Sequence, residues 1–157
     1  MEYPLLLSIH IASVIMLLGI GGGSAFYKFI ADRSDNIDVI VHTNKTVVLV
    51  DWLVTTPSVL LQPITGILLM QTLGFNYKIP WLFASIMLYI LSILLWLVAV
   101  YLQIKMKNIA TKAKANNHPL GTPYFLYVKY WIILGFFSFF SMFGIYLLMV
   151  FKPIISL

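Results

Sequence analysis

Residues Ser8 to Phe26, SIHIASVIMLLGIGGGSAF, are the clearest indication of how this chain folds. It contains no Asp, Glu, Lys or Arg, and a run of about 20 mostly apolar residues is what an α-helix needs to cross a bilayer. Two features are unusual for a simple anchor: His10 lies near its start, and four glycines lie between positions 19 and 23. We therefore expect a membrane-spanning helix that accommodates one polar ring and permits close approach of a neighbour.

The composition extends this prediction to the whole chain. Of the 157 residues, 61% are hydrophobic and 10% are charged, and the mean hydropathy is +0.97, which indicates a membrane protein. The absence of cysteine excludes disulfides, thiolate metal sites, iron–sulfur clusters and cysteine nucleophiles. No GxSxG, glycine-rich phosphate loop or HExxH motif is present, so hydrolases and phosphotransferases find no support.

Four windows are long and apolar enough to span a membrane, and they predict an all-α, polytopic protein: one domain over residues 1–157, folded as a compact antiparallel four-helix bundle. The windows cover about residues 4–28, 46–73, 81–103 and 125–151. Pro57 and Pro63 should bend the second span without dividing it, with Thr55, Thr56 and Ser58 bonding to the freed backbone groups. The first span lacks a basic leader and a cleavage site, which favours a retained helix over a signal peptide.

The distribution of Lys and Arg predicts the orientation. Eight basic residues flank the connections after spans one and three, namely Lys28, Arg33, Lys45, Lys105, Lys107, Lys112, Lys114 and Lys129. The other side has only Lys78 and Lys152. The positive-inside rule then predicts a bacterial inner-membrane protein with both termini on the periplasmic or outer side and Tyr124 as an interfacial anchor. The net charge of +5 favours anionic lipid headgroups at the basic loop, residues 105–123, over nucleic acid.

Small and weakly polar residues repeat at helical spacing along the spans and predict their inward faces. The second span presents Asp51, Thr55, Ser58, Gln62, Thr65 and Leu69. The third presents Ser85, Ser92, Trp96, Ala99 and Gln103, and the fourth presents Trp131, Gly135, Ser138, Met142, Tyr146 and Met149. Most of these residues are explained by packing alone, because lipid gives helices no hydrophobic reason to associate.

Asp51 needs a separate explanation, because an ionised carboxylate inside a span costs a few kcal/mol unless it is paired, solvated or protonated. Lys129 enters the fourth span at a comparable depth, so we predict that the two side chains interact. The alternatives are that Asp51 lies in a wet vestibule while Lys129 extends to the headgroups. The stripe from Asp51 to Gln62 also suggests a path for protons.

The three histidines differ in setting. His118 is expected in solvent and His42 at the interface, whereas His10 lies inside the first span with no charged neighbour. A buried histidine can simply bond to an adjacent helix, but imidazole is also the usual protein ligand of heme iron, and bundle interiors hold such cofactors. Second ligands of the iron at a similar depth would be Met87, Met142, Tyr146 or Met149, and a five-coordinate iron is the alternative.

Four segments, HIASVIMLLGIGG, TTPSVLLQPITGILL, WLFASIMLYILSILLWL and LMVFKP, carry a resemblance that covers most of the chain. In this order they resemble a family of predicted bacterial four-helix membrane proteins. More distantly, the pairs His10 with Gly19, Pro57 with Gly66, and Lys152 with Pro153 are similar to those of HemJ-type protoporphyrinogen oxidases. That resemblance implies heme b near His10. The further histidine and the Arg-Asn-Glu signature of those enzymes are absent here.

Three functions follow as hypotheses. The first is a heme b protein with a redox role, either electron transfer or oxidation of a small, porphyrinogen-like substrate, in which His10 binds the iron. The second is a non-catalytic subunit of a larger membrane complex. The third is a carrier of a metal or small solute that uses His10, Gln62 and the methionines. A second copy or a partner subunit could complete a site at the surface formed by spans one and four.

Overall fold

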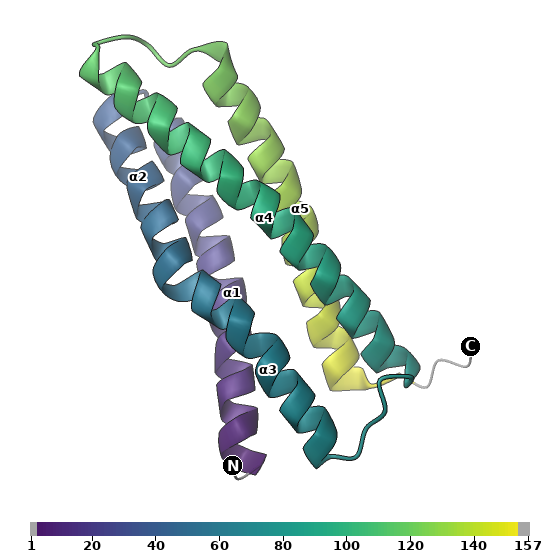
Figure 1. Ribbon diagram of the computed structural model, residues 1–157. Helices are drawn as coiled ribbons and strands as arrows, with labels where there is room; N and C mark the ends of the chain where they lie inside the picture. The colour runs from purple at the N-terminus through teal and green to yellow at the C-terminus, as the bar shows by residue number, and fades with distance from the viewer. Residues whose placement is uncertain (1–2, 154–157) are drawn as a thin grey trace.

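The computed structural model describes residues 3–153, which are almost entirely helical (Figure 1). The elements are α1 (Tyr3–Asp32), α2 (Ile37–Val50), the π-helical turn η1 (Asp51–Thr55), α3 (Thr56–Thr72), α4 (Pro80–Ala115) and α5 (Thr122–Phe151). Four helical segments are long and apolar enough to cross a membrane: α1, the continuous unit from Ile37 to Thr72, α4 and α5. No strand occurs among the described residues, so the all-α four-helix membrane fold is confirmed.

The helices run beyond the apolar windows at the basic end of the molecule. The second helical unit begins at Ile37, and α4 continues to Ala115, so only residues 116–121 connect α4 to α5. Most of the expected basic loop is therefore helix. The reason is that Met106 and Ala110, one turn apart, are completely buried in a cluster with Ile40 and Val41 of α2, which holds this end of α4 in helical form.

The second span is one bent helix, as predicted. Pro57 has no N–H to donate, and the turn before it widens so that the Thr56 N–H reaches the carbonyl of Asp51 five residues back. The Thr56 hydroxyl donates to the same carbonyl at 2.9 Å, as expected for a threonine beside a proline kink. Figure 1 shows the change of direction between α2 and α3.

Pro63 lies inside α3, and a different helix compensates for it. Its missing N–H would have bonded to the carbonyl of Val59, and the hydroxyl of Tyr89 on α4 donates to that carbonyl at 2.6 Å instead. The sequence predicted local threonine and serine side chains for this task. The actual donor joins α3 to α4, a pair that makes few other contacts.

The helices pack as two groups instead of one compact bundle. The interface of α4 with α5 is the most extensive, and Ser92 and Ser138 face each other there, each hydroxyl near the other's carbonyl. On the other side α1 packs on α3 and α2, and α2 packs on α4 at the basic end. Figure 1 shows α1 and α3 diverging from α4 and α5 towards the end where α1 begins and α5 stops. The antiparallel order is as predicted, whereas the compactness is not.

Candidate functional site

His10 lies between α1 and α3, where both of its ring nitrogens have partners. The hydroxyl of Thr65 donates to the carbonyl of Leu61 at 2.7 Å, so the imidazole Nδ1–H donates to the Thr65 oxygen, 2.8 Å away. Nε2 then accepts from the side-chain amide of Gln62 at 3.1 Å. The ring packs directly on α3 at Gly66, where an added Cβ would lie in van der Waals contact with it, 3.4 Å from Cε1. The imidazole is a neutral link between two helices.

This arrangement does not fit a heme b held by His10. Both nitrogens are engaged, the ring lies against the backbone of α3, and His10 does not line the cavity described below. Of the expected second ligands, Met87 and Tyr146 are 44% and 46% exposed and face outwards, and Met142 lines that cavity without His10. Heme binding stays a prediction of the sequence that no described contact supports.

Asp51 and Lys129 do not form the expected pair. Asp51 is buried, with Oδ1 accepting from the Thr55 hydroxyl at 2.8 Å, and Lys129 is exposed. The ion pairs in the described part of the chain are Lys28 with Asp32 and Lys114 with Asp38. Lys129 precedes the buried Trp131 by two residues, about 200° around a helix, so it lies on the opposite face of α5.

A cavity of about 500 Å³ lies between the two helix groups, and it is the best candidate for a binding site. It is lined from α1 by residues that include Gly21 and Gly22, from the bent span by Asp51, Thr55 and Val59, and otherwise by α4 and α5. Aromatic side chains dominate the lining: Phe26, Phe29, Tyr89, Trp96, Trp131, Phe136, Phe139 and Phe140.

Three buried polar atoms of this lining have no hydrogen-bond partner within the described structure. They are Oδ2 of Asp51, Nε1 of Trp96 and Oε1 of Gln103. The first and third accept hydrogen bonds and the second donates one. Such groups are almost always satisfied in native proteins, and each unsatisfied one costs several kcal/mol in a bilayer. Their convergence on one cavity therefore indicates a bound polar group or water.

The cavity opens to the side of the molecule between α1 and α5. Phe26, Phe136 and Phe140 line it and are 61%, 57% and 53% exposed, and α1 contacts α5 over only a small area. Because both helices are candidate membrane spans, the opening faces lipid. An incomplete site at the surface of spans one and four was one expectation from the sequence, and the cavity lies at that surface.

A polar cluster at the basic end was not anticipated. The Lys28 ammonium, 1% exposed, donates to both oxygens of Asp32 at 3.1 and 2.9 Å and to the Tyr124 hydroxyl at 3.0 Å. That hydroxyl also donates to Asp32 at 2.5 Å and accepts from the amide of Asn44 at 2.9 Å. Tyr124 is completely buried, so its expected role as an interfacial anchor is wrong. The spacing of Lys28 and Asp32 by four residues was the available signal.

Comparison with known proteins gives a family and no function. No curated protein and no solved structure matches the chain. The family model that does match covers residues 4–153 and is described as a predicted integral membrane protein. This match supports the resemblance to a family of predicted membrane proteins, and it gives no support to the resemblance to HemJ-type enzymes. Over nearly its whole length, the chain thus belongs to the DUF2269 family of predicted integral membrane proteins.

Proposed function

We propose that this membrane protein is a carrier that binds a small lipophilic amine in the cavity between its helix groups. The observation that supports this proposal is the convergence of the unpartnered Asp51, Gln103 and Trp96 atoms on an aromatic cavity of about 500 Å³. Pockets of this size, apolar with a few placed polar groups, are typical of small-molecule sites.

The polar groups favour a donor-rich, cationic ligand. A protonated amine would donate to the carboxylate of Asp51 and to the amide oxygen of Gln103, and it would offset the cost of burying that carboxylate. Aromatic rings such as Trp96 and Tyr89 attract a cation through their faces. A hydroxyl, ether or carbonyl oxygen on the ligand would accept from Trp96. The apolar remainder would contact the phenylalanines.

The position of the opening supports uptake from the bilayer. A lipophilic amine partitions into the membrane, and the exposed rim of Phe26, Phe136 and Phe140 lies between two spans. The ligand would enter sideways, without crossing the basic surface at the end of the molecule. This is the small-solute carrier hypothesis, with Asp51 in the role first given to His10.

The test is equilibrium binding of labelled propranolol, a naphthyl ether with a hydroxyl and a secondary ammonium group, to protein in lipid nanodiscs, with empty nanodiscs subtracted. Asp51→Asn should weaken binding by about tenfold or more, because a hydrogen bond to a charged group contributes about 1.5–3 kcal/mol. The neutral analogue 3-(1-naphthyloxy)propane-1,2-diol should bind both proteins equally.

Asp38→Asn is the matched control, since it removes an exposed carboxylate paired with Lys114 on the surface. It should bind propranolol like the wild type. Equal affinity of the wild type and Asp51→Asn for the amine would contradict the proposal. A loss of affinity in Asp38→Asn as large as the loss in Asp51→Asn would also contradict it.

A further inference from the structure

A second hollow lies at the basic end, between α2 and α4, and it is independent of the cavity described above. It has a volume of about 640 Å³ and is lined by Lys45, Val48, Leu49 and Trp52 of the bent span and by Lys107, Asn108, Thr111 and Lys112 of α4. We call these eight residues the α2–α4 groove.

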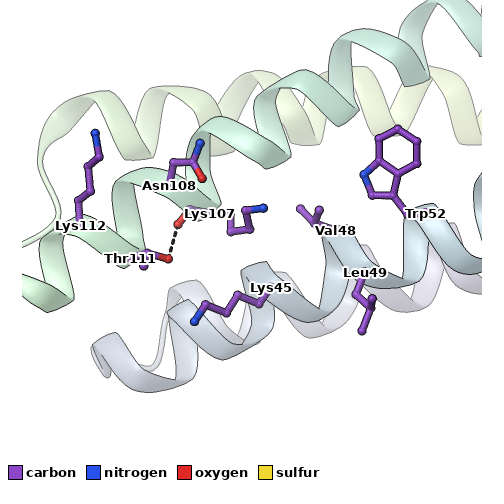
Figure 2. A pocket seen from close by; sticks show the side chains of 8 residues that line it. All are labelled: Lys45, Val48, Leu49, Trp52, Lys107, Asn108, Thr111 and Lys112. Carbon is purple, nitrogen blue, oxygen red and sulfur yellow. Dashed lines mark hydrogen bonds between the residues drawn. The ribbon is translucent and has the colours of Figure 1, made fainter.

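The groove is polar at one end and apolar at the other (Figure 2). Lys45, Lys112 and Asn108 lie towards the end of the helices, and the Lys107 side chain extends from there towards Val48. Leu49 of α2 and Trp52 of η1 lie further from that end. Leu49 and Trp52 are 56% and 57% exposed, although they belong to a candidate membrane span. This order, cationic at the surface and apolar below it, is that of a phospholipid standing in one leaflet.

The charge of the groove is uncompensated. Among the described residues none of its three lysines forms an ion pair, and no Asp or Glu lines it. The nearby carboxylate of Asp38 is paired with Lys114, which lies outside the groove. The Thr111 hydroxyl donates to the backbone of Lys107, so the groove offers three ammonium groups and the Asn108 amide as donors.

From this arrangement we infer that the α2–α4 groove binds one anionic phospholipid of the adjacent leaflet, its phosphate held by Lys45, Lys107 and Lys112 and its acyl chains lying against Val48, Leu49 and Trp52. Basic pockets between membrane helices suit anionic headgroups, since each lysine near the surface adds to the attraction. The basic residues flank the segments that the positive-inside rule assigns to the cytoplasm, where anionic lipids lie.

Quenching of Trp52 fluorescence by brominated lipid tests this inference in nanodiscs of neutral lipid. Brominated phosphatidylglycerol should quench at a mole fraction about tenfold lower than brominated phosphatidylcholine. The difference in quenching between the wild type and Trp52→Phe is the part that comes from Trp52, and it therefore measures lipid bound in the groove. The preference for phosphatidylglycerol should be abolished in a triple variant that combines Lys45→Gln, Lys107→Gln and Lys112→Gln. Lys112→Gln alone should reduce this preference, which keeps the test valid if the triple variant folds poorly.

The matched control replaces three basic residues of the same end that lie outside the groove, Arg33, Lys105 and Lys129, with Gln. It changes the net charge equally and should keep the preference. An equal effect of both triple variants, or equal quenching of the wild type by the two lipids, would overturn the inference. Loss of the preference in inorganic phosphate at matched ionic strength would also overturn it, because the groove would then bind free phosphate.

Discussion

At the scale of single residues, His10 shows how one polar side chain can stabilise a membrane fold without chemistry of its own. Its two ring nitrogens bond to Thr65 and Gln62 on α3, and the ring packs against Gly66. In a bilayer such bonds contribute about 0.6 kcal/mol each on average, because the unfolded chain also finds partners there. The histidine that suggested heme in the sequence is explained by packing.

Replacement of His10 by Leu should therefore lower the free energy of unfolding by about 1–2 kcal/mol, since two helix–helix bonds are lost and the Gln62 amide loses its partner. Thermal unfolding in detergent measures this. Ser8→Ala is the control, because the Ser8 hydroxyl bonds only to the carbonyl of Pro4 within α1 on an exposed face.

A visible spectrum gives a second test of this structural role. Wild-type protein purified from cells supplied with heme precursor should show no Soret band. A Soret band that is present in the wild type and absent in His10→Leu would contradict the structural role.

Residue-level prediction from the sequence succeeded for the burial of the second span and failed for pairing. On the fourth span it was wrong for Tyr146, which was predicted to face inwards and is 46% exposed. The entire stripe predicted on the second span, from Asp51 to Leu69, is buried. The pairing of Asp51 with Lys129 was inferred from depth alone, and depth does not say which way a side chain points around its helix. The burial of Lys28 was not predicted for a similar reason: the Tyr124 hydroxyl, which accepts from Lys28, and Asn44, which donates to that hydroxyl, reach the cluster only when three helices come together.

At the scale of elements, the two prolines of the second span are accommodated in different ways. Pro57 follows a π-helical turn of its own chain, and Pro63 depends on Tyr89 of α4 to satisfy the carbonyl of Val59. The sequence predicts a bent span, because proline cannot donate. It could not identify Tyr89, since nothing in a hydropathy pattern specifies which neighbouring helix supplies a donor.

A double-mutant cycle tests the role of Tyr89. Tyr89→Phe should lower the free energy of unfolding by about 1–2 kcal/mol, because it leaves the Val59 carbonyl without a donor inside the bilayer. In a Pro63→Ala background the backbone N–H restored by the alanine can bond to that carbonyl, so the same change should cost less than half as much. Equal costs in the two backgrounds would show that Tyr89 stabilises the protein in another way.

At the scale of the whole molecule, the separation of the helices into two groups creates the candidate site. The sequence predicts the number of spans, their order and their inner faces, because a bilayer imposes helix length and satisfied backbone groups. It does not predict the distance between helices. The glycines of α1 and the stripes on α4 and α5 indicated close packing, yet Gly21 and Gly135 border the cavity and a Cβ at either would meet nothing within 4 Å.

Amine binding by a variant whose cavity is filled shows most directly whether the cavity is the binding site. Gly135→Leu places a side chain into the cavity from α5, whereas Gly19→Leu makes the same change on α1 at a position that does not line it and has equally open space. Both variants gain helix propensity, about 1 kcal/mol relative to glycine, so neither should unfold.

If the cavity is the binding site, the affinity of Gly135→Leu for labelled propranolol is lower than that of the wild type by about tenfold or more, equivalent to about 1.4 kcal/mol. Gly19→Leu binds propranolol with the affinity of the wild type. Binding by Gly135→Leu that is indistinguishable from the wild type would show that the amine binds elsewhere.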